Sequence, residues 1–450
     1  MTETPMDFQV VRESIQETNL KSVGLATIRD INRIVNNIES KTGKKFIRME
    51  MGIPGLRPPE IAIEAEIDSL KNGVGSIYPP FDGIPELKDE ISRFIKLFMN
   101  ININPKSCFP TVGSMQGCYM GLMVTGRRKK GKNKTLFIDP GFPVNKLQTK
   151  VIGLESERFD IFDFRGKNLR NVLESFLKKG HFASIMYSNP NNPAWICFTE
   201  TELQIIGELA TKYDTIVLED LAYFGMDFRI DYSKPGMPPY IPTVARYTDN
   251  YILLISSSKS FSLAGQRIGI TAISDPLFNS EGDYLEKYFG SNTFGRAYIY
   301  GAMYALSSGV SHSAQYGLLS LLKAVNDGNF NFLEPVKEYG RRAVVMKRLF
   351  LDNGFYFVYD KDEDKPLSDG FYFTVAYPGF SGEELVEELL YYGISAISLA
   401  IAGSDRKEGI RACVSLTDEK QFPILEARLK KFKEDHEQGF RAIDIQIENT

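Results

Sequence analysis

The sequence has few of the residues that hold structural metals or disulfide bridges. Its 450 residues include four cysteines and three histidines, and no two cysteines form a Cys-x-x-Cys pair. Zinc sites and disulfide frameworks need such residues clustered at short spacings. We therefore predict neither a disulfide scaffold nor a metal site.

Neither sign of charge dominates, and no long apolar run is present. Lys and Arg number 53 against 57 Asp and Glu, a formal net charge of -4, which gives no general attraction to nucleic acids or acidic membranes. No apolar run approaches the roughly 20 residues of a membrane-spanning helix. The first residues, MTETPMDFQ, lack the basic-then-apolar pattern of a signal peptide. We expect a cytoplasmic protein with no membrane or nucleic-acid partner.

Short apolar runs that alternate with helix-like stretches occupy the middle of the chain. The runs lie at 108–112, 135–138, 183–187, 215–218 and 251–255. A capping box of Thr199 and Glu202 marks a helix between the third and fourth runs. Strands alternating with helices predict an α/β fold with a mainly parallel sheet.

Three other segments have distinct patterns. After about residue 310, amphipathic helices mix with alternating strands at 371–377 and 410–416, which predicts a second, α+β domain. The proline-rich segment 234–242 is typical of a loop. The basic segment 127–134 is typical of a solvated turn between a helix and a strand, and nothing else in the sequence indicates an anionic partner for it.

Polar or aromatic groups follow each of the five apolar runs. In chain order they are Gly113 in GSMQG, Phe142 in DPGFP, Asn192 in SNPNNP, Asp220 with Tyr223, and Ser256 with Lys259 and Arg267. Each has an ordinary structural explanation when taken alone, such as a turn, a packed ring or a helix cap. Ligands bind at the carboxyl ends of parallel strands, so together they predict one site at one edge of the sheet.

The spacing around the lysine resembles a known enzyme family. A serine precedes Lys259 by three residues and an arginine follows it by eight, and an Asp-x-x-Tyr pair, an Asn-Pro motif and GIPEL (83–87) lie upstream. This combination resembles the class I/II aminotransferases, the aspartate aminotransferase-like enzymes of fold type I that depend on pyridoxal 5'-phosphate (PLP). The resemblance extends from about residue 45 to 416.

The resemblance implies a two-domain architecture. The large PLP-binding domain, 55–305, would hold a mainly parallel sheet flanked by helices. A smaller α+β domain would combine 1–54 with 306–450. Since a tyrosine from the neighbouring subunit reaches the cofactor phosphate in the family, and Tyr78 matches it, a homodimer with shared active sites is implied. Ser291 matches a second contact from the neighbour.

The resemblance also assigns catalytic roles. Lys259 would hold PLP as a Schiff base and, once freed by the substrate, would move a proton. Asp220 would pair with the pyridine nitrogen, whose protonation helps the ring to accept electrons. Tyr223 would donate to the ring's phenolic oxygen. The other implied cofactor contacts are Gly113, Ser114, Met115, Phe142, Asn192, Ser256, Arg267 and Tyr78.

Two further residues match the family's substrate contacts, in addition to Asn192. Arg411 matches the arginine that binds the α-carboxylate, for which a planar guanidinium is suited. Gly52, in EMGIPG, matches a glycine whose backbone lies near the same carboxylate.

The sequence departs from the family pattern at three points. Phe142 stands where Trp or Tyr is more usual, so it keeps a stacking ring and loses a hydrogen bond. Ala194 and Trp195 follow the Asn-Pro motif in place of Thr-Gly, and Trp195 is interpreted as a packed loop residue or, alternatively, a substrate contact. Lys287 lies near the position where aspartate aminotransferases carry an arginine for a side-chain carboxylate. Lysine is not equivalent there, so no dicarboxylate preference is predicted.

The function implied is transfer of an amino group between an amino acid and a 2-oxo acid. A PLP-dependent carbon–sulfur β-lyase is an alternative, because it shares these motifs. A PLP-binding transcription regulator is an alternative of another class, although the roughly 45 residues before the matched region show no basic recognition segment. A fold retained only as a scaffold is disfavoured, because the expected cofactor residues are all present.

Overall fold

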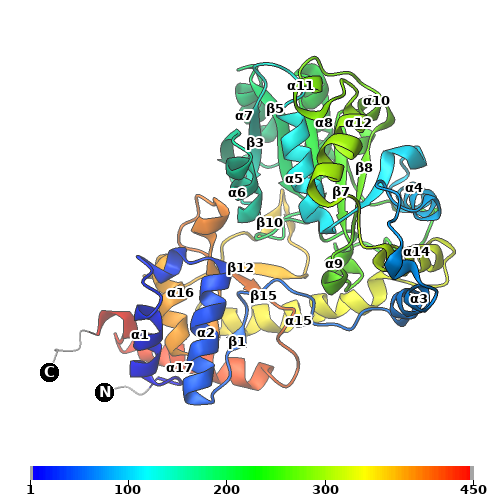
Figure 1. Ribbon diagram of the computed structural model, residues 1–450. Coiled ribbons are helices and arrows are strands. Elements are labelled where there is room, and N and C mark those ends of the chain that lie inside the picture. Colours follow the sequence, from blue (N-terminus) through cyan, green and yellow to red (C-terminus); the bar gives the residue numbers. More distant parts are fainter. Residues whose placement is uncertain (1–3, 446–450) are drawn as a thin grey trace.

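Seven strands form the central sheet of the computed structural model, which describes residues 4–445 (Figure 1). Across the sheet their order is β2-β8-β7-β6-β5-β3-β4. β8 is antiparallel to both of its neighbours, and the other pairs are parallel. The strands are β2 (Cys108–Thr111), β3 (Lys134–Asp139), β4 (Glu155–Asp160), β5 (Phe182–Ser188), β6 (Ile216–Leu221), β7 (Tyr251–Ser256) and β8 (Gly269–Ile273).

The five predicted apolar runs are confirmed as β2, β3, β5, β6 and β7, whereas β4 and β8 were not predicted. β4 is an edge strand of sequence ESERFD with an exposed first half, so it carries no apolar run. β8 is GITAI, which begins at a glycine only two residues after Arg267. Because the segment that carries Lys259 and Arg267 runs directly into this strand, no separate apolar run marks where the strand begins.

Helices connect and cover these strands. They include α5 (Gly113–Thr125), α6 (Pro143–Val151), α7 (Leu169–Leu177) and α8 (Glu200–Lys212). The predicted capping box is present at α8, where Thr199 accepts from the Glu202 N–H and the Glu202 carboxylate accepts from the Thr199 N–H. α5 packs on β6, β7 and β8, so its first turn lies beside the carboxyl end of β7.

A second, smaller sheet lies in the lower part of Figure 1 and has the order β14-β15-β12-β9, all antiparallel. Its strands are β9 (Tyr356–Phe357), β12 (Tyr372–Ala376), β14 (Ile397–Ser398) and β15 (Ile410–Cys413), and its helices are α15 (Leu333–Asp352), α16 (Gly382–Tyr391) and α17 (Phe422–Glu437). The strands predicted at 371–377 and 410–416 are confirmed as β12 and β15.

The beginning of the chain packs on this smaller part. α1 (Phe8–Gln16) and α2 (Ile28–Thr42) lie beside α16 and α17 (Figure 1), and β1 (Ile47–Arg48) pairs in parallel with β13 (Ile394–Ser395). Residues far apart in sequence therefore build one sheet-and-helix unit. The domain limits 55–305, 1–54 and 306–450 stay a prediction, and residues 1–3 and 446–450 lie outside the described residues.

Three helices pack together beside the central sheet. α14 (His312–Asn326) packs against α3 (Glu60–Lys71) and α4 (Pro85–Met99). The remaining elements are short: α9 (Ser257–Ser260), α10 (Asp275–Phe278), α11 (Glu286–Phe289), α12 (Phe294–Arg296), a π-helix (Ala297–Met303), α13 (Tyr304–Ser307), β10 (Lys361–Asp362), β11 (Lys365–Pro366), and the 3-10 turns Val23–Leu25, Val74–Ser76, Pro105–Ser107, Gly166–Asn168, Val244–Arg246, Ala264–Gln266, Leu399–Ala402 and Ala442–Asp444. No helix within residues 4–445 is long and apolar enough to cross a membrane.

The basic segment 127–134 forms turns and the start of β3. Arg128 and Lys129 both pair with Asp214, at 2.9 and 2.5 Å, and Lys132 donates to the carbonyl of Tyr213. These cations are therefore paired with the protein's own groups, as the turn interpretation implies.

Candidate functional site

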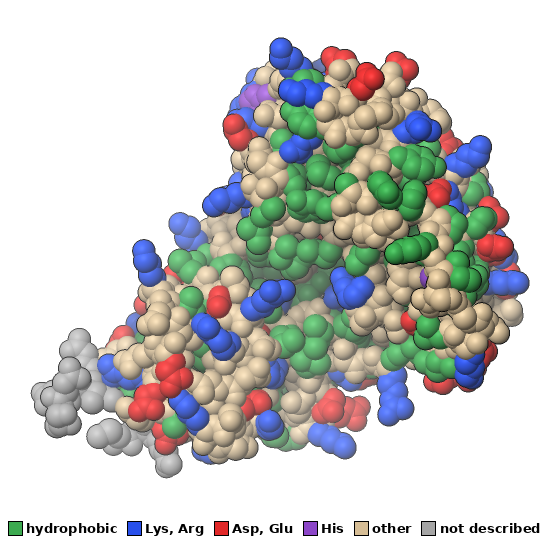
Figure 2. All heavy atoms as spheres, in the orientation of Figure 1, with side chains coloured by type: hydrophobic (Ala, Val, Ile, Leu, Met, Phe, Trp, Pro, Cys, Tyr) green, Lys and Arg blue, Asp and Glu red, His purple; other side chains and the backbone are tan. Residues whose placement is uncertain are grey.

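A cavity of about 260 Å³ opens between the central sheet and the smaller part. Figure 2 shows the molecule hollowed between these two parts, with apolar side chains gathered around the hollow. Every predicted site residue except Gly113 and Tyr78 lines the cavity. Its lining is Ile28, Met51, Gly52, Ile53, Ser114, Met115, Cys118, Phe142, Ser188, Asn192, Asp220, Ala222, Tyr223, Ser256, Ser258, Lys259, Arg267, Tyr372 and Arg411.

Lys259 lies on α9, directly after the carboxyl end of β7. Its side chain is partly accessible from the cavity and otherwise enclosed by protein. Burial lowers the pKa of Lys259 to about 8, and the nearby guanidinium groups of Arg267 and Arg411 act in the same direction. The amine is thus far less basic than that of an ordinary lysine and can act as a nucleophile or base near neutral pH.

Asp220 lies at the carboxyl end of β6 and is almost fully buried. Burial raises the pKa of Asp220 to about 7, against the opposing effects of the Ala222 N–H and of Lys259. Within residues 4–445, no donor reaches its Oδ1 atom. A buried carboxylate oxygen without a partner is costly, and it fits a ligand that brings an N–H or a positive charge.

An anion cradle is formed where α5 begins. The N–H groups of Ser114 and Met115 lie in the first turn of this helix, which leaves N–H groups free and is positively polarised. Gly113 contributes differently from its expected role, because its N–H donates to the carbonyl of Arg267 at 3.1 Å. Gly113 has a φ of +62°, and a Cβ there would come within 2.7 Å of the Arg267 guanidinium. Glycine therefore lets Arg267 approach the helix start.

Arg411, on β15, lines the cavity from the smaller sheet and is 1% exposed. Its Nη1 donates to Asn192 Oδ1 at 3.2 Å, and its Nη2 donates to the carbonyl of Glu50. Its guanidinium lies over the ring of Tyr372, 4.5 Å from the centroid. In the part of the chain that the structure describes, its Nε atom has no acceptor. The arrangement fits an arginine that is oriented for a carboxylate ligand.

Three residues expected at or near the site lie away from this cavity. Tyr78 is 89% exposed. Lys287, on α11, lies over the rings of Tyr284 and Tyr288, and the Ser291 hydroxyl accepts from a nearby backbone N–H. A single chain thus does not bring these side chains to its own cavity.

Two further aromatic residues, Trp195 and Tyr372, shape the site. Trp195 is fully buried, does not line the cavity, and donates through Nε1 to the Ser368 hydroxyl at 2.9 Å, as expected of a packed loop residue. Tyr372 does line the cavity and was missed. Its strand pairs with β15, with Tyr372 opposite Cys413, so only knowledge of this register would have indicated it.

Among residues 4–445, no three His, Cys, Asp or Glu side chains are grouped as a metal site would require. The chemistry that the cavity offers comes instead from one amine of lowered basicity, one unpaired carboxylate, two guanidinium groups and a helix start. These groups can bind anions at both ends of a ligand and hold or move a proton between them.

Comparison with known proteins places this cavity in a family. The chain is 27% identical over 322 residues to a probable aspartate aminotransferase of Methanocaldococcus jannaschii, covering 67% of this chain and 82% of that protein. It is 26% identical over 259 residues to an LL-diaminopimelate aminotransferase of Natranaerobius thermophilus, covering 57% and 64% respectively.

The fold has close counterparts among solved structures. Alanine aminotransferase from Pyrococcus furiosus superposes with a TM-score of 0.72 at 22% identity, covering 91% of this chain and 97% of that one. A match to the family model described as aminotransferase class I and II extends over residues 44–425. That match spans most of the chain, both parts of the fold and every residue that lines the cavity except Ile28, and the chain therefore belongs to the class I and II aminotransferase family.

Proposed function

We propose that this aminotransferase holds PLP on Lys259 and moves an amino group between an amino acid and a 2-oxo acid. The single observation that carries the proposal is the content of one cavity. Lys259, with its lowered pKa, faces Asp220, whose Oδ1 is unpaired, between the α5 start and Arg411. PLP offers an aldehyde, a pyridine nitrogen and a phosphate, so each of its polar groups has a complementary partner here.

The cofactor, when bound, supplies an electron sink for the substrate's α-carbon. The chain's own contribution is binding and proton handling. At pH 7 a lysine of pKa about 8 is neutral in roughly one molecule in ten, and an ordinary lysine in fewer than one in a thousand. Lys259 can therefore attack the aldehyde and later hold or release a proton near neutral pH.

The remaining residues orient the ligands. Asp220 would keep the pyridine nitrogen protonated, because the pair relieves the cost of a buried carboxylate. Ser114, Met115 and Arg267 would bind the phosphate. Arg411 would bind the substrate carboxylate, a group that amino acids and 2-oxo acids share. These assignments match the roles expected from the sequence, and mutation can test each of them.

The proposal includes a homodimer with shared sites. Tyr78 is the most exposed large apolar side chain in the described part of the chain, and other exposed apolar residues precede it in the sequence, namely Ile61, Ile67, Leu70 and Ile77. Exposed apolar patches are typical of interfaces. A Tyr78→Ala chain mixed with a Lys259→Ala chain tests the sharing. If sites are shared, hybrids carry one intact site and recover about a quarter of wild-type activity, whereas unshared sites give no recovery.

The cofactor assignment is tested by absorption spectroscopy of the protein purified with PLP. We expect a visible band of covalently bound cofactor that is absent from Lys259→Ala. Lys287→Ala, which changes a lysine outside the cavity, is the matched control and should keep the band. If wild type and Lys259→Ala give the same spectrum, Lys259 is not the attachment residue and the proposal fails.

The reaction is tested by adding single amino acids without a 2-oxo acid. Transamination predicts loss of the visible band, one equivalent of 2-oxo acid per site, and recovery of the band when a 2-oxo acid is added. The lyase alternative predicts continuous release of pyruvate and ammonia without any acceptor. The amino acids that respond would also define the donor class.

A further inference from the structure

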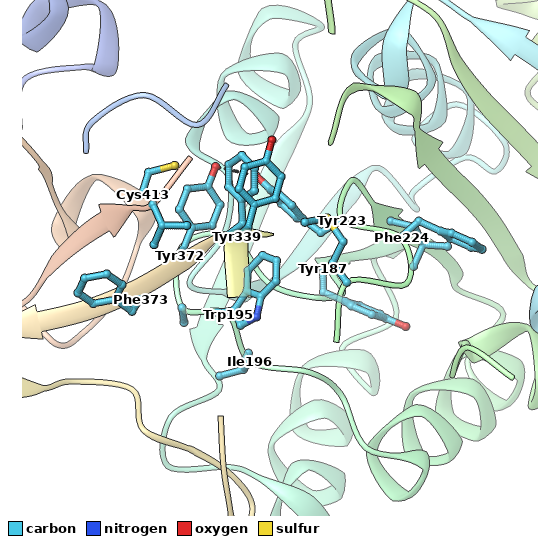
Figure 3. Packing of buried hydrophobic residues seen from close by; sticks show 14 of the residues in the cluster. Tyr187, Trp195, Ile196, Tyr223, Phe224, Tyr339, Tyr372, Phe373 and Cys413 are labelled. Atoms are coloured by element: carbon cyan, nitrogen blue, oxygen red, sulfur yellow. Dashed lines mark hydrogen bonds between the residues drawn. The ribbon is translucent and has the colours of Figure 1, made fainter. Parts of the chain in front are cut away.

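Tyr372 lies beside three residues assigned to two ligand groups: Tyr223 to the cofactor's phenolic oxygen, and Arg411 and Gly52 to the substrate carboxylate. Its hydroxyl is 2.7 Å from the Tyr223 hydroxyl, and its ring lies under the guanidinium of Arg411 at 4.5 Å. A Cβ on Gly52 would come within 2.0 Å of the same Tyr372 hydroxyl. Figure 3 shows Tyr372 and Tyr223 in one buried aromatic cluster with Trp195, although the three come from different elements of the chain.

The two tyrosine hydroxyls can form a directed chain of hydrogen bonds. Each hydroxyl has one hydrogen to donate. If Tyr223 donates its hydrogen to a ligand oxygen, its own oxygen can still accept a hydrogen bond. Among the described residues, the Tyr372 hydroxyl lies in position to donate that bond. Burial raises the pKa of Tyr372, so this hydroxyl stays protonated near neutral pH. Hydrogen bonds in such a chain polarise and strengthen one another.

The ring of Tyr372 contacts Arg411. A cation over an aromatic face is held by the ring quadrupole, and the effect grows when water is excluded. Both side chains are about 1% exposed, and the β12–β15 pairing fixes their backbones relative to each other. Tyr372 can therefore restrict the orientation of Arg411 while its hydroxyl contacts Tyr223.

We propose that Tyr372 is a positioning residue for the amino-group transfer: its hydroxyl donates to Tyr223 and strengthens the bond of Tyr223 to the cofactor's phenolic oxygen, and its ring orients Arg411 for the substrate carboxylate. The inference rests on the proposed function. It links the two halves of the site through one side chain of the smaller sheet.

The first test is a pH titration of the visible absorption of the cofactor-loaded enzyme, which reports the pKa of the Lys259–cofactor linkage. A donor to the phenolic oxygen stabilises the deprotonated linkage, so losing it raises this pKa. Tyr223→Phe should raise it by about one unit or more, and Tyr372→Phe by about half a unit. In the Tyr223→Phe background, Tyr372→Phe should add nothing, because its effect passes through Tyr223.

A matched control is Tyr392→Phe, which also removes a buried hydroxyl from the smaller part, one that donates to Asp435 at 2.9 Å. It should leave the titration unchanged. A Tyr372→Phe curve identical to wild type would overturn the inference, and so would an equal shift with and without the Tyr223 hydroxyl. If wild type shows no titrating cofactor band, the proposed function itself fails, which is a separate outcome.

The second test separates the ring from the hydroxyl by steady-state kinetics. Tyr372→Phe keeps the ring, so its KM for the amino acid should stay within about twofold of wild type. Tyr372→Leu removes the ring and should raise that KM about threefold to thirtyfold. Equal KM values for the two variants would refute the role of the ring. If Tyr372→Leu fails to fold, the titration of Tyr372→Phe still decides the proposal for the hydroxyl.

Discussion

Replacing Asp220 by Asn should stabilise the cofactor-free protein, and more so as the pH rises. Burial raises the pKa of this carboxyl from 3.8 to about 7. In the unfolded chain it ionises near pH 4, while in the folded protein it stays protonated up to about pH 7. The folded state therefore binds more protons between these values, and its stability falls as pH rises through this window.

The size of the effect follows from the shift. A shift of about three pKa units corresponds to about 4 kcal/mol of folding stability. Somewhat more than 1 kcal/mol of this stability is already lost at pH 5, and all of it is lost by pH 8. Asparagine has nearly the same shape and no charge to bury. Its amide leaves a buried donor unsatisfied, but that cost does not depend on pH. The stability difference between Asp220→Asn and wild type should thus grow by about 2–3 kcal/mol from pH 5 to pH 8.

The assay is urea unfolding of the cofactor-free proteins at pH 5 and pH 8, comparing the midpoints of variant and wild type at each pH. Asp68→Asn is a suitable control, because Asp68 is 70% exposed and its replacement should give the same difference at both values. A difference for Asp220→Asn that does not grow with pH would refute the reasoning, since it would mean that burial does not disfavour the charged carboxylate.

Three other substitutions have expected outcomes. Arg411→Lys keeps the charge but loses the planar fork, so the KM for the amino acid should rise about 10- to 100-fold in steady-state assays; an unchanged KM would contradict carboxylate binding there. Gly370→Ala would place a Cβ 2.1 Å from the Trp195 ring, and thermal unfolding should show a loss of about 1–3 kcal/mol. Glu202→Gln removes the buried carboxylate that Arg165 contacts at 2.7 Å, and should lower the free energy of unfolding by about 3–5 kcal/mol, measured by urea unfolding. Unfolding midpoints equal to those of wild type would contradict the predictions for Gly370→Ala and Glu202→Gln.

The parts of the fold that the sequence predicted are those governed by local pattern. Apolar runs become largely buried strands, and the capping box at Thr199 marks the start of α8. β4 was not predicted, because an edge strand whose first half is exposed carries no apolar run. The pairing of β1 with β13 joins Ile47 to Ile394, and no local pattern encodes a contact across nearly 350 residues.

In the candidate site, too, local sequence pattern could place some residues, and others depend on contacts between distant parts of the chain. The carboxyl ends of parallel strands meet at one edge, so Asn192, Asp220 and Lys259 could be placed together from their positions after apolar runs. Arg411 was assigned only through the family resemblance, because it lies on a strand of the other sheet. Tyr372 was missed for a physical reason: its contact with Tyr223 depends on how the two sheets face each other.

The position of Trp195 explains how the two sheets are held in that relation. Its ring makes edge contacts with Tyr223 and Tyr372 at 5.3 and 6.1 Å, and the absence of a Cβ on Gly370 leaves room for it. A loop of the central sheet thereby packs behind two tyrosines that face the cavity from different parts of the fold. The Ala-Trp departure from the family's Thr-Gly is therefore a packing feature: a large buried ring contacts both tyrosines of the Tyr223–Tyr372 pair.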